Sequence, residues 1–229
     1  MSSLYDGNCV RTFGGVVFLT CLAAFAASAS IIQNDATLPP ENGGYVTPAQ
    51  IHACFAAHNV CLDNGTHFGF IGASSTFDGA GQHEQFQSEF DGELFNGTNT
   101  TDMGPIKLFG PVGVTIFGRA TPTQLGTFST QMTLLHLTAG PVVIQLDPGQ
   151  TTTGMTTVAD NGGGTFRITS FFDVFTELST DGGLTFEPAT TGSSHVNLQP
   201  IPEPGTLGLT GLGALGLWLC FRKRSRRTA

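Results

Sequence analysis

Charged side chains are scarce in this 229-residue chain. They make up 11% of it, where about 25% is usual in soluble globular proteins. Basic residues are scarcest: residues 30–201 hold three of them against 15 acidic residues, a net charge of −12. Nucleic-acid phosphates would repel such a segment. We therefore expect no nucleic-acid partner, and a soluble domain that lies outside the cell.

Recognisable catalytic motifs are also missing. The sequence has no P-loop, no dinucleotide-binding fingerprint and no G-x-S-x-G. His83-Glu84 is half of a zinc-protease motif, but Gln87 stands where the second histidine is needed. We therefore expect no enzyme activity and no cofactor, with calcium at an aspartate-containing turn left open. A hydrolase with two carboxylates across a β-cleft is the less favoured alternative.

Glycine and phenylalanine are abundant, with 31 and 19 copies, and apolar residues alternate with polar ones. The longest alternating run includes Phe166, Ile168, Phe172 and Val174. Period-2 runs between Gly, Pro and Asp turns indicate an all-β, antiparallel sandwich or barrel. No repeat of 20–50 residues is visible, which argues against a solenoid. We predict a β-sandwich, jelly-roll or immunoglobulin-like, over residues 67–199.

Residues 30–66 form the predicted lead-in to that domain. Pro39-Pro40 and Gly43-Gly44 indicate irregular chain. Over residues 48–62 we predict a short helix, with Thr47 as its N-cap and Pro48 in its first turn.

Cys54 and Cys61 are the cysteines of this expected mature domain, since Cys9, Cys21 and Cys220 lie in the end segments. In an exported protein two such cysteines indicate a disulfide. The alternative is a zinc site, because four histidines lie near the pair in sequence: His52, His58, His67 and His83. Their spacing matches no standard zinc module. Unpaired thiols and surface histidines are the third interpretation.

The first 29 residues have the layout of a secretory signal peptide. Arg11 precedes an apolar run over residues 14–26. Ala27-Ser28-Ala29 matches the small-x-small pattern that signal peptidase cuts after. We expect a signal helix over residues 1–29 and cleavage after Ala29. An uncleaved anchor is the alternative, but the run is shorter than the roughly 20 residues that span a bilayer.

A second uncharged apolar run covers residues 206–221, and a basic tail follows over residues 222–227: Arg222, Lys223, Arg224, Arg226 and Arg227. The positive-inside rule keeps such a cluster in the cytoplasm, so the acidic segment would lie on the far side of the membrane. We predict a transmembrane helix over residues 206–221. The run is slightly short for a bilayer, a difference that local thinning absorbs.

Residues 200–229 combine the motif Pro202-Glu203-Pro204, the Leu/Gly-rich run and the basic tail. This order closely resembles the PEP-CTERM sorting signal. The resemblance implies recognition by an exosortase, a membrane transpeptidase-like cysteine protease, and removal of the tail near the motif. It also implies transit through the inner membrane of a Gram-negative bacterium to the cell surface or extracellular matrix. A plain single-pass anchor is the alternative.

Residues 179–186, with the sequence STDGGLTF, resemble an Asp-box, the S-x-D-x-G-x-T-[WF] hairpin of many exported β-proteins. In that motif the aspartate bonds turn amides and glycine permits a positive φ. We therefore interpret Asp181 as a structural turn residue.

Together these features predict an exported, non-enzymatic protein of the cell surface or polysaccharide matrix. A polysaccharide- or ice-binding module is the alternative, indicated faintly by Thr151-Thr152-Thr153 and Thr156-Thr157. The expected processing partners are signal peptidase and exosortase, and the ligand of the central domain is left open.

Overall fold

The computed structural model describes residues 30–48 and 51–201. This part of the chain contains no helix and 13 strands, all paired antiparallel. The strands are β1 (Ile31–Gln33), β2 (Gly43–Val46), β3 (Ile51–Phe55), β4 (Val60–Phe77), β5 (Gly81–Asn96), β6 (Asp102–Phe117), β7 (Gly126–Ala139), β8 (Val142–Leu146), β9 (Thr153–Gly162), β10 (Thr165–Val174), β11 (Thr176–Ser179), β12 (Glu187–Pro188) and β13 (Ser194–Pro200). The all-β, antiparallel prediction is confirmed.

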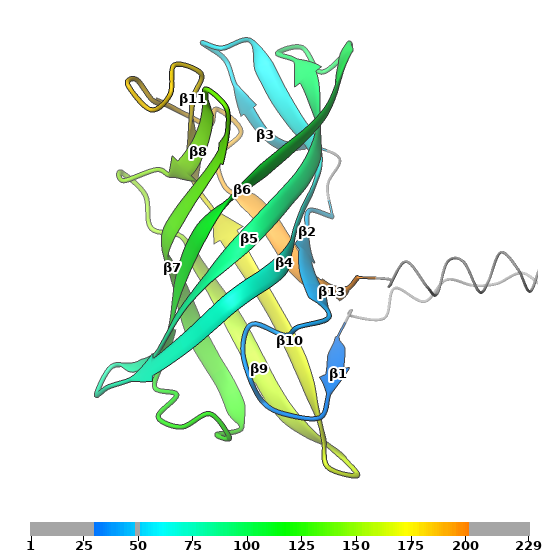
Figure 1. Cartoon of the computed structure of the whole chain (residues 1–229), viewed down its shortest axis with the longest axis vertical. Helices are drawn as coiled ribbons and strands as arrows, with labels where there is room; N and C mark the ends of the chain where they lie inside the picture. The colour runs from blue at the N-terminus through cyan, green and yellow to red at the C-terminus, as the bar shows by residue number, and fades with distance from the viewer. Residues whose placement is uncertain (1–29, 49–50, 202–229) are drawn as a thin grey trace, which may run out of the picture.

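Eight of these strands form a closed barrel, in the order β10, β13, β2, β4, β5, β6, β7 and β9. Strand β9 closes the ring, because it pairs with β7 on one side and with β10 on the other. Figure 1 shows the long strands crossing the barrel obliquely. The predicted sandwich is therefore wrong. Inward and outward residues alternate along the strands of both architectures, so the sequence pattern could not separate them.

The remaining strands extend this ring. Strand β1 pairs with β10, and β3 pairs with the first part of β4. Next to β7, β8 pairs with β7, β11 pairs with β8, and β12 pairs with β11. In Figure 1 the hairpin of β3 and β4 lies at the upper end of the barrel and the turn between β9 and β10 at the lower end.

The predicted helix over residues 48–62 is also wrong. Strand β3 and the start of β4 form a hairpin there, with Asn59 at a φ of 54° in the turn. Within β3, His52, Ala53 and Phe55 are buried and Ile51 is exposed, and the pairing with β4 shifts register between Ile51 and Ala53. Residues 31–66 thus supply β1 to β3 and part of β4 to the same sheet as residues 67–199.

Two glycines allow the long strand β4 to bend. Gly69 and Gly72 have φ values of 65° and 67°, where a Cβ would be strained. They lie at two shifts of register between β4 and β5, on either side of Ile71. Such bulges curve a strand and increase its twist, as closure of a barrel requires.

The barrel interior is lined by side chains from every strand of the ring, most of them apolar. On β5, alternate residues from Gln82 to Phe90 are buried. The core cluster of the described residues runs from Ile31 to Leu198. Residues 30–201 therefore hold the whole of that core and form one self-contained folding unit.

Candidate functional site

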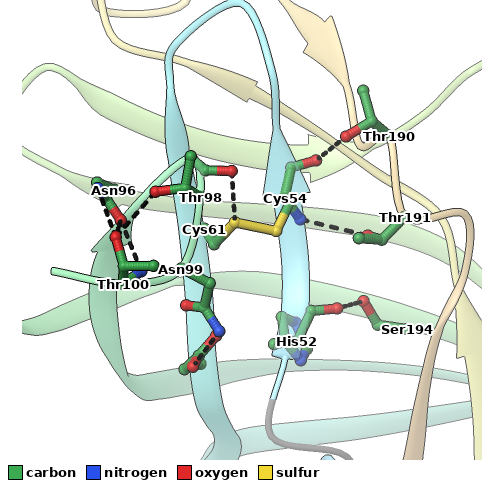
Figure 2. Close-up of a disulfide and its surroundings, with 12 residues drawn as sticks. His52, Cys54, Cys61, Asn96, Thr98, Asn99, Thr100, Thr190, Thr191 and Ser194 are labelled. Carbon is green, nitrogen blue, oxygen red and sulfur yellow. Dashed lines mark hydrogen bonds between the residues drawn. A yellow bond between two sulfur atoms is a disulfide. The ribbon is translucent and has the colours of Figure 1, made fainter. Parts of the chain in front are cut away.

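The hairpin of β3 and β4 is cross-linked. Cys54 and Cys61 lie opposite each other in register and form a disulfide, with Cα atoms 4.0 Å apart (Figure 2). The Cys54 carbonyl accepts a hydrogen bond from the Thr190 main-chain N–H at 2.7 Å, and the Cys54 N–H donates to the Thr191 hydroxyl at 3.2 Å. The disulfide thus holds a hairpin that is also bonded to the segment leading into β13.

The four histidines considered for the alternative zinc site lie in three separate places. His52 and His67 are close, with ring centroids 5.7 Å apart, beside Phe90. His58 is near Thr180, and His83 pairs with Asp78 at 3.0 Å. Among residues 30–48 and 51–201, no three His, Cys, Asp or Glu side chains are grouped to hold a metal. With both sulfurs in the disulfide, the described residues bring no zinc ligand set together.

Burial sets the protonation of the two neighbouring histidines. The pKa of His52 is lowered to about 4 by burial, and that of His67 to about 3 by burial and by the neighbouring His52. Both rings are therefore neutral near pH 7. His52 Nδ1 lies 2.5 Å from the Thr47 hydroxyl, the residue expected to cap a helix. This pair is a structural contact inside the barrel.

Asp181 organises the turn after β11 as the Asp-box resemblance implies. Its carboxylate accepts hydrogen bonds from the Thr185 hydroxyl at 2.6 Å and from the main-chain N–H groups of Leu184 and Thr185 at 3.0 and 2.9 Å. Those bonds, the Thr185 hydroxyl first, and one from Ser179, hold the pKa of Asp181 well below its usual range. Gly182 and Gly183 have φ values of 77° and 89°.

The threonines that suggested an ice-binding face do not share one surface. Thr152 and Thr156 are buried, whereas Thr151 and Thr153 are exposed. Thr156 points into the barrel, where its hydroxyl lies 2.8 Å from that of Ser170. A flat, regular threonine array is therefore not formed by these residues.

A polar network inside the barrel is the feature that the sequence did not indicate. Glu84 is 2% exposed and faces inward from β5. Its Oε1 accepts hydrogen bonds from the Ser75 hydroxyl at 2.5 Å and from the Gln82 amide. Burial raises the pKa of this carboxyl. The Gln82 side-chain carbonyl accepts in turn from Arg119, which is fully buried.

A cavity adjoins Glu84 in the barrel interior. Its apolar lining includes Phe70, Phe86, Met132 and Phe172. About 40 Å³ of it is open to the centre of a water molecule. Eight-stranded barrels have interiors that are either filled by side chains or hold one small ligand, and this interior leaves a narrow space.

Hydroxyl groups form a second polar feature in the same interior. The Tyr45 hydroxyl donates to Ser170 Oγ at 3.0 Å, and Ser170 lies against Thr156. Burial raises the pKa of Tyr45 to about 12. Tyr45 and Thr156 both line the cavity.

One signal could have pointed to this interior. Gln82, Glu84 and Ser88 occur at alternate positions with Phe86 and Phe90, so they share one face of a strand. In the sequence, Glu84 stood out solely as part of the pair His83-Glu84. Polar residues at inward positions are the expected mark of a buried network.

A known sorting motif begins at the end of β13. The model for the PEP-CTERM protein-sorting motif matches residues 200–227. The chain carries a PEP-CTERM sorting domain. That domain implies an exported protein that is processed by exosortase and sorted to the cell surface of a Gram-negative bacterium. No curated protein and no solved structure matches the chain.

Several predictions for the two ends lie outside the described residues. They are the signal peptide with its cleavage pattern Ala27-Ser28-Ala29, the motif Pro202-Glu203-Pro204, the transmembrane run over residues 206–221 and the basic tail. Within residues 30–48 and 51–201, no helix has the length and apolarity that a membrane crossing needs.

Proposed function

We propose that this is a non-enzymatic protein of the cell surface or extracellular matrix, exported and then retained among polysaccharide as a folded barrel. The PEP-CTERM sorting domain at residues 200–227 carries the proposal. Strand β13 ends at Pro200, so the sorting domain follows the barrel directly. The disulfide between Cys54 and Cys61 supports an oxidising destination.

The use of the ionisable side chains supports a role without catalysis. His195 pairs with Asp173 at 2.7 Å, and Lys107 bonds both Glu89 and Asp91 at 3.0 and 2.7 Å, all on the outside of the barrel. Asp181 is occupied by its turn. These ionisable side chains are therefore engaged in structural contacts.

Localisation tests the proposal. Antibodies against the barrel should label intact cells and the matrix fraction of the wild-type strain. Deletion of residues 202–229, which leaves the barrel unchanged, should release the protein into the medium, and deletion of the exosortase should leave an uncut precursor in the membrane. A barrel found in the cytoplasm of the wild-type strain would overturn the proposal.

Polysaccharide binding is the second candidate, and a polar row on the outer surface favours it. The row crosses six strands through successive register partners: His83, Thr115, Gln131, Thr153, Asp173 and His195. Thr115 is buried beside His83, and the other five side chains are exposed or half-exposed. Amide, hydroxyl and imidazole groups donate and accept hydrogen bonds, as sugar hydroxyls require. Co-sedimentation with the host's purified exopolysaccharide should weaken in Gln131→Ala/Thr153→Ala and not in Thr138→Ala. Absence of co-sedimentation by the wild-type barrel would remove this candidate.

A further inference from the structure

We infer that the barrel interior binds a small, mostly apolar molecule with one hydrogen-bond-donating end, a hydroxyl or a protonated amine, which Glu84 receives. This inference goes beyond surface retention. It rests on a buried acceptor that lacks a donor, on the apolar cavity beside it and on the rigidity of the cavity wall.

The first observation is the unpartnered oxygen of Glu84. The Oε2 atom is buried and has no hydrogen-bond partner among the described residues, although Oε1 has two. A buried carboxylate oxygen without a donor destabilises the fold, and such atoms are rare in folded proteins. A donor supplied from the cavity would satisfy it.

Arg119 does not supply that donor. Its guanidinium is the nearest buried cation to Glu84, yet its hydrogen bonds go to the Gln82 side chain and to three main-chain carbonyls, those of Ala36, Pro122 and Gln124. Gln82 thus stands between the two charges, bonding Arg119 through its oxygen and Glu84 through its nitrogen. The geometry leaves the second Glu84 oxygen for a ligand.

The second observation is the apolar character of the space that Glu84 lines. Phe70, Phe86, Met132 and Phe172 all line it. A buried water typically needs two to four polar partners, which the aromatic side of this cavity does not offer. An apolar body with a polar end matches the two sides better than water does.

The third observation is that the wall is already in place. Phe70 and Phe86 meet edge to face with ring centroids 5.2 Å apart, and Tyr45 and Phe172 do so at 5.3 Å. Preformed apolar pockets with a few placed polar groups are typical of small-molecule sites. The roughly 40 Å³ open to water centres limits the ligand to a slender chain or one small ring.

The chemistry of Glu84 also sets the ligand's charge. A carboxylate-ended molecule would place a second acidic group against it, and two carboxyl groups at one site disfavour each other's ionised form. Alcohols and amines of the same length have no such conflict. We therefore expect 1-hexanol and hexylamine to bind, and hexanoate to bind at least tenfold more weakly.

The methionines of residues 30–201 provide the test. Met132 lines the cavity, whereas Met103 and Met155 are exposed on the outside. With ¹³C-methyl-methionine label in the 30–201 barrel, titration with 1-hexanol or hexylamine at pH 7 should shift the Met132 signal and leave the other two in place. Equal shifts at all three methyls, no shift at Met132, or equal affinity for hexanoate would each overturn the inference.

A variant pair then assigns the polar end. Glu84→Gln keeps the size of the side chain and removes its charge, so hexylamine affinity should fall at least tenfold. Glu89→Gln makes the same change on the outward face of β5, beside Lys107, and should leave affinity unaltered. Unchanged hexylamine binding in folded Glu84→Gln would refute the role of Glu84. If that variant does not fold, the ranking of the three wild-type ligands decides.

Discussion

The guanidinium of Arg119 donates a hydrogen bond of 2.5 Å to the main-chain carbonyl of Ala36, 83 residues earlier in the chain. This bond fastens the segment between β1 and β2 to the end of β6. Leu38 and Pro39 of that segment line the interior cavity. A single buried side chain thus links the Glu84 network, through Gln82, to the segment that covers one side of the cavity.

Arg119→Met should therefore destabilise the barrel strongly. Removing one partner of a buried charged network costs about 3–5 kcal/mol, because Gln82 and the three carbonyls lose their donor. The free energy of unfolding of residues 30–201 in urea measures this loss of stability. Arg167→Met is the matched control, since Arg167 bonds Asn161 on the exposed surface, and it should change the free energy of unfolding by less than about 1 kcal/mol. Equal losses in the two variants would contradict the assignment.

Loss of the disulfide should have a moderate effect. In the chain-entropy model the short loop between Cys54 and Cys61 contributes about 2–3 kcal/mol, and the hairpin keeps its bonds to Thr190 and Thr191 without it. Cys54→Ala/Cys61→Ala should unfold at lower urea than the oxidised wild type. Reductant should lower the urea midpoint of the wild type to about that of the variant, and it should leave the midpoint of the variant unchanged. A wild type insensitive to reductant would show that the thiols are not bonded in solution.

The turn of residues 179–186 should loosen locally when its aspartate is removed. Asp181→Ala deletes the acceptor for two main-chain N–H groups and two hydroxyls. Hydrogen exchange at Leu184 and Thr185 should speed up, while β5 and β6 keep their protection. Asp160→Ala, near the end of β9, where Asp160 accepts from the Gly162 N–H, should leave those two amides unaffected. Unchanged exchange in Asp181→Ala would show that the motif is not holding the turn.

The sequence predicted the class of the fold and missed its closure. Alternation over Phe166 to Val174 marked β10 as a strand. Closure depends on β9 pairing with two partners, which no local pattern records. The helix was predicted from Thr47 and Pro48 at its start, yet the pairing of Cys54 with Cys61 across a hairpin was stronger than those local preferences. The sorting motif was readable because it is contiguous. The Glu84 network joins residues from 36 to 124 and depends on tertiary structure.

Acid should destabilise the barrel through His52, which is buried, and His67, which is half-buried. The pKa values of His52 and His67 are about 4 and about 3 in the folded protein, against about 6.5 unfolded. Below pH 6.5 the unfolded chain therefore binds protons that the folded barrel does not, and stability falls as pH drops from 6.5 toward 4. Each pKa unit corresponds to about 1.4 kcal/mol, so the loss should reach several kcal/mol. Urea midpoints at pH 7.5, 5.5 and 4.5 measure this decline.

His67→Phe isolates that effect, because a phenyl ring can keep the edge contact with Phe90, whose ring centroid lies 4.8 Å from that of His67. The variant cannot take up a proton, so its stability should fall less steeply between pH 6.5 and 4.5. A slope equal to that of the wild type would contradict the lowered pKa of His67.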